Sequence, residues 1–180
     1  MAKKKEELLI FKILAGVAVL IAIFIAYNIV TSSPLSLPAD DMSEIPDLST
    51  EGYVEVRPEA AVSAAGGLVA LSGGCYRVVA NTDVTQATSI INGIENIVSV
   101  RPNAHDLVKE IFDTMDIQLV MVKVVDIQEN NYIGTVVVRQ GDKILSLDSR
   151  PSDGIAIAVR TNSTIYFNES LLKERGEKIC

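Results

Sequence analysis

The chain has 180 residues, which is enough for one ordinary domain and an appendage. Its 16 Lys and Arg against 23 Asp and Glu give a formal net charge of −7, which argues against a general nucleic-acid coat protein with a basic face. The two cysteines, Cys75 and Cys180, are too few for a disulfide framework, and neither has a second cysteine or a histidine at metal-ligand spacing. We expect buried or incidental thiols.

The N-terminal 31 residues have the pattern of a membrane anchor. Residues 1–12 are a short basic segment with four lysines and two glutamates, and residues 13–30 carry no charge. A helix over that run would be about 27 Å long, close to the hydrocarbon thickness of a bilayer. A cleaved signal peptide also fits a lysine-rich start and an apolar run. Because the run is long and no clear small-x-small site follows it, we expect residues 13–31 to be an uncleaved single transmembrane helix.

The charges on either side of this segment predict its orientation. Lysines precede it and acids follow it, so we expect the N-terminus in the cytoplasm and the rest of the chain outside the cell membrane. Residues 32–50 contain Pro34, Pro38, Pro46 and four acids without hydrophobic periodicity, which indicates an extended linker. The folded domain is therefore expected over residues 51–180, where 17 acids outnumber 12 bases.

The first half of this domain is predicted to hold three strands and one helix. Alternating residues favour strands at 53–57, 68–72 and 75–80, with a small, loose segment at 60–67. The Gly-Gly pairs lack a following Lys-Ser/Thr and a helix, so they indicate turns and not phosphate loops; Gly73-Gly74 is a hairpin signal. An apolar stripe predicts a helix over 83–94, capped by Asp83.

The second half is predicted to alternate between helices and strands. Asn103 and Asp106 match a capping pattern. The helix that follows is expected to bury Leu107, Val108, Ile111, Phe112 and Met115. Residues 117–127, 132–139 and 143–148 favour a three-strand antiparallel meander whose first strand is buried on both faces. A helix after Pro151, a strand at 164–167 and a helix at 168–175 complete an α+β fold, with helices packed on a mixed or antiparallel sheet.

Two junctions of the same kind stand before helices in this half. Arg101-Pro102 leads to His105 and Asp106, and Asp148-Ser-Arg150-Pro151 leads to Asp153. Each proline holds its arginine extended, and each first helical turn contains an aspartate near outward-pointing N–H groups. If both helices start at one sheet edge, the five charged residues of these junctions and the only histidine, His105, share a cleft. The alternative is local, since Ser149, Ser152 and Asp153 are also ordinary helix-capping residues.

These junctions carry a resemblance to a known family. Arg101-Pro-x-x-His105-Asp106-Leu, a valine-rich strand, then Asp148-x-Arg150-Pro-Ser-Asp153-x-Ile-Ala-Ile-Ala and Thr-Ile-Tyr near Ile165 resemble the bifunctional nuclease domain family, over Tyr53 to Leu172. The resemblance implies a compact α+β fold and, as in some plant members, nuclease activity on RNA and DNA. The chain departs from the family pattern in its N-terminal anchor and in Gly154, which replaces the usual alanine and is expected only to loosen the helix start slightly.

A nuclease of this kind predicts roles for the clustered residues. Asp106, Asp148 and Asp153 would hold Mg²⁺ or Mn²⁺, which activates water and clamps phosphate oxygens. Arg101 and Arg150 would bind the substrate phosphate. His105 would act as general acid or base together with the aspartates.

A structural interpretation of the same residues leads to a different class of protein. In it Asp106 and Asp153 cap helices, Arg150 pairs with Asp148 or Asp153, and His105 fixes the loop by hydrogen bonding. The chain would then be a non-catalytic binding or assembly domain with a structural polar cluster. Homo-oligomers formed through an exposed sheet edge are compatible with either alternative.

Overall fold

The computed structural model describes residues 20–21, 24 and 48–180. The chain divides into two compact units, Met1–Glu44 and Ile45–Cys180, and the second contains the whole α+β domain. Most of the expected anchor at 13–31 and of the expected linker at 32–50 lies outside the described residues. Among those that are described, no helix is long and apolar enough to cross a membrane.

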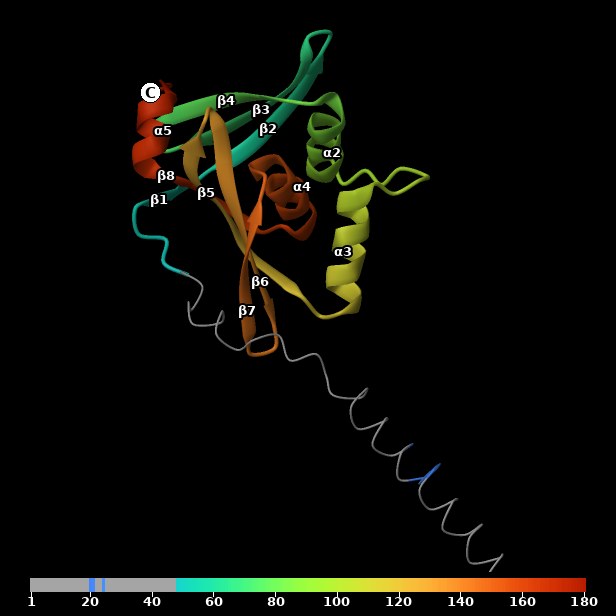
Figure 1. Cartoon of the computed structure of the whole chain (residues 1–180). Coiled ribbons are helices and arrows are strands. Elements are labelled where there is room, and N and C mark those ends of the chain that lie inside the picture. The colour runs from blue at the N-terminus through green and yellow to red at the C-terminus, as the bar shows by residue number, and fades with distance from the viewer. Residues whose placement is uncertain (1–19, 22–23, 25–47) are drawn as a thin grey trace, which may run out of the picture. The chain divides into compact units, whose positions relative to one another are not determined.

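The domain is built from two sheets (Figure 1). The first has the order β1-β8-β5-β6-β7 and contains the meander of β5, β6 and β7. Only the pairing of β5 with β8 is parallel. The strands are β1 (Tyr53–Glu55), β5 (Gln118–Gln128), β6 (Asn131–Gln140), β7 (Lys143–Ser149) and β8 (Thr164–Asn168). The sheet is therefore mixed, as expected, and the middle of β5 is buried on both faces.

The second sheet is antiparallel, with the order β2-β3-β4-β9. Its strands are β2 (Arg57–Ser63), β3 (Gly66–Gly73), β4 (Tyr76–Thr82) and β9 (Glu177–Lys178). The expectation of a loose segment at 60–67 is wrong, because Ala60–Ser63 pair with β3 despite their small side chains. Gly74, with φ +54°, makes the expected turn between β3 and β4.

Four described helices complete the domain: α2 (Val84–Ile94), α3 (Ala104–Thr114), α4 (Pro151–Thr161) and α5 (Glu169–Arg175). Asp83 caps α2 as predicted, and Asn103 and Asp106 form a reciprocal capping box on α3. The capping interpretation of the second junction is wrong. The N-cap of α4 is Arg150 without a side-chain cap bond, and Pro151 fills the first turn. The Asp153 carboxylate instead binds side chains, among them that of the N-cap residue Arg150.

Helix α4 packs closely on two strands and on a helix, and two glycines make this packing possible. A Cβ at Gly154 would lie 2.8 Å from Val122 Cγ1 and 3.2 Å from Val136 Cγ2. A Cβ at Gly93 of α2 would lie 2.8 Å from Arg160 Nη1. Gly154 therefore does more than loosen the helix start: it lets α4 approach the first sheet, where Ile155, Ala156 and Ala158 are buried.

Helix α3 differs from its prediction in burial. None of its residues is fully buried, and Leu107, Ile111 and Met115 are 55%, 41% and 53% exposed. Phe112 packs partly against the core, so only one side of the expected apolar face is covered. The expectation that all five apolar residues are buried is wrong, because α3 lies at the margin of the domain beside α2 and α4 (Figure 1).

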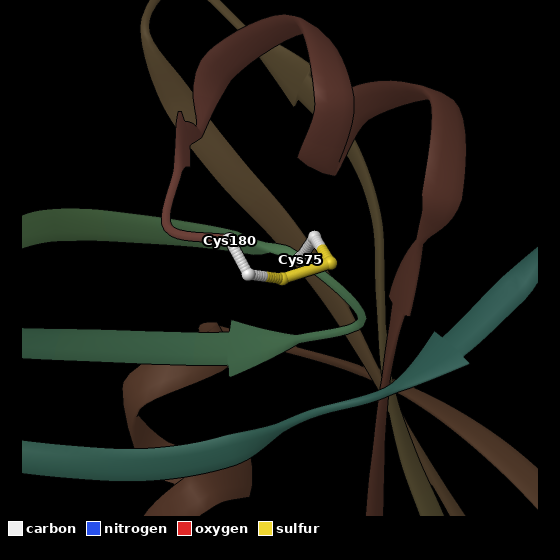
Figure 2. The surroundings of a disulfide bond; sticks show 2 residues. All are labelled: Cys75 and Cys180. Carbon is white, nitrogen blue, oxygen red and sulfur yellow. A yellow bond between two sulfur atoms is a disulfide. The ribbon is translucent and has the colours of Figure 1, made fainter.

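The cysteines form a disulfide between Cys75 and Cys180 (Figure 2), which corrects the expectation of incidental thiols. Cys75 lies in the turn before β4. The short strand β9 pairs with β4 at Tyr76 and Arg77, and Ile179 donates its N–H to the Cys75 carbonyl. The sequence separation of 105 residues gave no local signal for this bond. It fastens the end of the chain to the second sheet.

Candidate functional site

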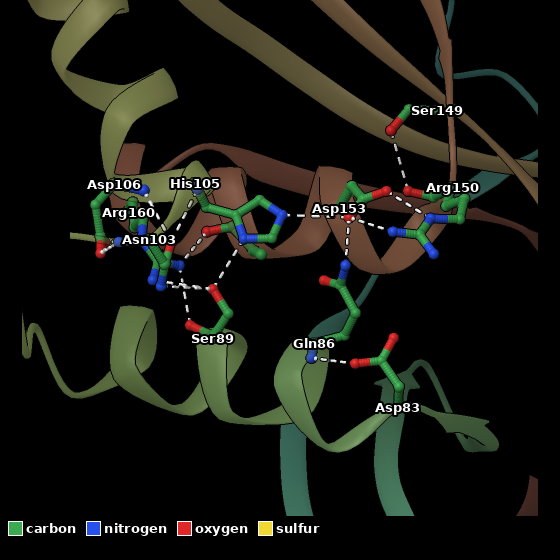
Figure 3. A network of polar contacts seen from close by, with 11 residues as sticks. Asp83, Gln86, Ser89, Asn103, His105, Asp106, Ser149, Arg150, Asp153 and Arg160 are labelled. Carbon is green, nitrogen blue, oxygen red and sulfur yellow. Dashed lines mark hydrogen bonds and ion pairs between the residues drawn. The ribbon is translucent and has the colours of Figure 1, made fainter. Parts of the chain in front are cut away.

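One polar network joins the first turns of α3 and α4 to the side of α2 (Figure 3). The predicted residues His105, Asp106, Arg150 and Asp153 all belong to it. Their expected proximity is confirmed for these four. The network is continuous from Asp106 through Arg160, Ser89 and His105 to Asp153 and Arg150.

The inner end of the network is the ion pair of Asp106 and Arg160. Arg160 Nε lies 2.7 Å from Asp106 Oδ1, and the two side chains are 5% and 9% exposed. Arg160 Nη1 also donates to the carbonyls of Ser89 and Ala156, and the second Asp106 oxygen accepts the N–H of Asn103. Both charges are thus buried with their hydrogen-bonding groups satisfied, which is the arrangement that buried ion pairs require.

Ser89 connects this inner end to the histidine. Its hydroxyl oxygen accepts from Asn103 Nδ2 at 3.2 Å and from Arg160 Nη2 at 3.1 Å, and it lies 2.9 Å from His105 Nδ1. The orientation of the Asn103 amide is fixed, because its oxygen accepts two backbone N–H groups at the start of α3. With both hydroxyl lone pairs occupied, Ser89 donates its own proton to Nδ1.

The protonation of the imidazole follows from that hydrogen bond. Nδ1 accepts from Ser89, so His105 is the neutral tautomer with its proton on Nε2, and Nε2 donates to Asp153 Oδ1 at 3.2 Å. Both ring nitrogens are used inside the protein. The geometry makes His105 a residue that positions Asp153, and its acid/base role stays a prediction.

The outer end of the network is Asp153 with Arg150. Arg150 Nε and Nη2 donate to the two carboxylate oxygens at 2.7 and 3.1 Å, and Gln86 Nε2 donates to Oδ1 at 2.8 Å. This confirms the pairing that the structural interpretation expects. The guanidinium of Arg150 is 67% exposed and Asp153 is 27% exposed, so this end faces solvent.

The partners of both carboxylates lower their pKa values. For Asp153, burial by itself raises the pKa, but hydrogen bonds from Arg150 and His105 outweigh it and lower the pKa below the ordinary 3.8. For Asp106, burial is likewise outweighed by hydrogen bonds from Arg160 and from the Asn103 backbone. The hydrogen bonds to Asp153 in turn raise the pKa of Arg150. All three groups are therefore charged near neutral pH.

Asp148 and Arg101 stand apart from this network. Asp148 is exposed at the end of β7, and Arg101 is exposed in the loop before α3. Over residues 48–180, no three His, Cys, Asp or Glu side chains are close enough together to hold a metal ion. Asp106 is paired with Arg160 and Asp153 is paired with Arg150, so in this arrangement the two carboxylates bind arginines. The assignment of Asp106, Asp148 and Asp153 as metal ligands stays a prediction.

A cleft of about 740 Å³ opens beside the outer end of the network. It lies between the second sheet, the hairpin that joins β5 to β6, and the segment from Asp148 to Ser152. Asp148 and Arg150, the two predicted site residues that the local sequence places together, thus share one cavity. A volume of this size is typical of small-molecule sites.

Three residues of the network escaped the sequence prediction: Gln86, Ser89 and Arg160. Gln86 and Ser89 lie on α2 among ordinary helix residues. Arg160 carried a weak signal, since it is the one charge in the apolar run Ile155–Arg160. A charged side chain at the end of such a helix needs a partner. Nothing local identified that partner as Asp106, 54 residues away.

Comparisons with known proteins identify a family for this chain. The family model for the bifunctional nuclease domain matches residues 78–179, which include the whole network. Two uncharacterised proteins of Mycobacterium tuberculosis, from strain CDC 1551 / Oshkosh and strain ATCC 25618 / H37Rv, are each 29% identical over 92 residues. The match covers 51% of this chain and 54% of each relative, so the chain spans about half the length of these curated relatives. The family match covers more than half of the chain, and the chain belongs to the bifunctional nuclease domain family.

Proposed function

We propose that this protein hydrolyses phosphodiester bonds of nucleic acid at the outer end of the network, where Arg150 lines the cleft and is paired with Asp153. The observation that carries the proposal is the paired, solvent-facing Arg150 and Asp153 beside a cavity, in a chain that belongs to a nuclease-named family. Neither feature would be sufficient by itself, because ion pairs at helix starts are common.

The chemistry divides among residues according to their exposure. Arg150 presents a guanidinium that is suited to bind phosphate oxygens and to stabilise the charge that develops on them. His105 and Gln86 hold Asp153 in place by hydrogen bonds. Once Arg150 turns to the phosphate, the Asp153 carboxylate accepts a proton from the attacking water or would bind the metal ion. Asp148 on the cleft wall is the second carboxylate within the same cavity. Mg²⁺ or Mn²⁺ belongs to this proposal as a cofactor that activates water.

The test is hydrolysis by the purified full chain. Labelled single-stranded RNA and DNA are incubated with Mg²⁺, with Mn²⁺ and with a chelator, and the initial rates are compared. We expect Asp153→Asn to lower kcat/KM by about 100-fold or more and Arg150→Met by about 10-fold or more, since each removes a group that acts on the transition state. Arg57→Met, on exposed β2 outside the cleft lining, is the matched control and is expected to retain the rate.

Two results would contradict the proposal. Activity that survives both Asp153→Asn and Arg150→Met comes from a contaminant. No cleavage by the wild type under any metal condition, with the fold intact by circular dichroism, favours the second candidate, a non-catalytic binding domain. That candidate is supported by the internal satisfaction of the network, in which both nitrogens of His105 and both oxygens of Asp106 have protein partners.

We further propose that residues 13–31 anchor the protein in a membrane and that the domain faces an oxidising compartment. The charge-free run at 13–30 supports the anchor. The disulfide between Cys75 and Cys180 supports the compartment, because such bonds persist mainly outside the reducing cytosol. Protease protection in sealed membrane vesicles, before and after lysis, tests both. Equal digestion of the domain on the two sides would rule out a fixed orientation.

A further inference from the structure

The cleft beside Arg150 contains more apolar surface than phosphate binding alone requires. Val69, Leu71 and Val78 of the second sheet and Ile155 and Phe167 of α4 and the first sheet form its floor as core residues that are 1–6% exposed. Tyr132 on β6 contributes an aromatic ring, which meets Phe167 edge-to-face at 5.8 Å and 70°. The half-buried ring of Tyr132 is therefore the aromatic surface that a flat, apolar ligand body would contact in this space.

Amide side chains lie at the edge of the same cleft. Asn130 and Asn131 come from the tight turn between β5 and β6. That turn has φ of +49° at Glu129 and +67° at Asn130, as a two-residue hairpin turn of the primed type needs. An amide both donates and accepts hydrogen bonds, so these side chains suit a ligand whose edge has donors and acceptors.

The charges around the cleft balance one another. Its lining has two carboxylates, Asp83 and Asp148, and two guanidiniums, Arg150 and Arg175. The body of the ligand is therefore expected to be uncharged, with any anionic group placed at Arg150, which belongs to both the cleft and the network. A neutral, flat ring with a hydrogen-bonding edge, joined to a phosphate, is the chemistry of a nucleotide.

We propose that the cleft takes one unpaired nucleobase of the strand whose phosphate lies at Arg150. This rests on the proposed function and specifies its substrate as single-stranded nucleic acid. A base that is paired in a duplex has no free edge for the asparagines and no free face for Tyr132, so it enters only after it leaves the stack. Base stacking on aromatic side chains tolerates every base, so the cleft prefers single strands without strong sequence preference.

The test compares binding of two probes that differ only in their bases. One is a fluorescein-labelled hexathymidylate and the other is the same backbone with abasic tetrahydrofuran units. Fluorescence anisotropy with the full chain in the presence of a chelator measures both, and gel analysis verifies that the probes stay intact. The wild type is expected to bind the base-bearing probe about tenfold more tightly, and a stably paired hairpin duplex no better than the abasic probe.

Two variants locate the effect. Ala80→Phe places a ring in the cleft from β4, opposite Val69, and is expected to bring the two probes within about twofold of each other. Ala61→Phe puts the same ring on exposed β2, outside the cleft lining, and is expected to keep the preference. Thermal unfolding verifies that both variants are folded. Should Ala80→Phe not fold, Tyr132→Ala, which removes the ring, takes its place.

The outcomes separate this inference from the proposed function. Equal binding of both probes by the wild type overturns the base pocket, even if the protein cleaves nucleic acid. A preference for bases that Ala61→Phe abolishes as fully as Ala80→Phe also overturns it, because the effect is then not local to the cleft. A preference that only the cleft variant removes establishes the pocket, even in a protein that cleaves nothing.

Discussion

The two ends of the polar network contain the same pair of residue types in opposite surroundings. Arg160 and Asp106 are 5% and 9% exposed, whereas Arg150 and Asp153 are 67% and 27% exposed. In the inner pair, carbonyls and backbone N–H groups occupy the remaining donors and acceptors. In the outer pair, the guanidinium is open to solvent.

This contrast distinguishes an ion pair that stabilises the fold from one that can bind a ligand. A buried pair that loses one partner leaves an uncompensated charge, so it fixes the relative positions of α2, α3 and α4. An exposed pair contributes little to stability and exchanges its partner at little cost. The neutral His105 and Ser89 transmit the fixed geometry of the inner pair to Asp153. The inner pair thus stabilises the packing of the three helices, whereas the outer pair is suited to bind a ligand.

The largest effect that tests this contrast is the removal of each arginine. Arg160→Met is expected to lower the free energy of unfolding by about 3–5 kcal/mol, since it leaves Asp106 buried without a partner. Arg150→Met is the matched variant and is expected to cost less than about 1 kcal/mol. Urea denaturation followed by circular dichroism measures both. Similar losses from the two variants would refute the division between the ends.

A smaller effect is expected from Ser89→Ala, which breaks the connection between the ends. The side chains of Asn103, Arg160 and His105 each lose their hydrogen bond to Ser89, at a cost of about 1–3 kcal/mol. Since the chain has a single histidine, its ¹⁵N imidazole signals are unambiguous. We expect the wild type to show the proton on Nε2 and the variant to show a mixture of tautomers. A wild-type imidazole protonated on Nδ1 would contradict the hydrogen-bond assignment.

The smallest effect concerns acid stability. Asp106 and Asp153 have lowered pKa values in the folded state, so their stabilisation is fully present above the unfolded value of about 3.9 and is lost as the pH falls through their folded pKa values. Stability should therefore decrease below about pH 4. Asp106→Asn and Asp153→Asn are each expected to make this decrease shallower, Asp106→Asn more so because its site is more buried. A decrease of unchanged steepness in both variants would show that other groups cause it.

The sequence predicted those features that short stretches of chain determine. The cap of α2 by Asp83 and the capping box of Asn103 and Asp106 are local bonds over three residues, and the β5–β6–β7 meander follows from alternating side chains and turns. The ion pair of Arg150 and Asp153 could also be predicted, because the two residues are one helical turn apart in the sequence.

The sequence did not predict features that depend on packing between elements far apart in the chain. Arg160 meets Asp106 across the contact of α4 with α3, and Gly93 and Gly154 let α4 lie close to α2 and to the sheet. Ser89 carried no signal, since a serine inside a helix usually faces solvent. The exposed face of α3 was misjudged because an apolar stripe indicates that a face is suited to burial, not that a partner within the domain covers it.

The disulfide between Cys75 and Cys180 makes a covalent ring of the segment that contains every residue of the network. A single protease cut within the exposed loop at residues 97–101 would separate the part of the chain with Gln86 and Ser89 from the part with His105 and Asp153. Both pieces would remain one molecule, because each retains one cysteine of the bond. The two halves of the site would then reassemble at the effective concentration of a tethered pair, independent of how dilute the protein is.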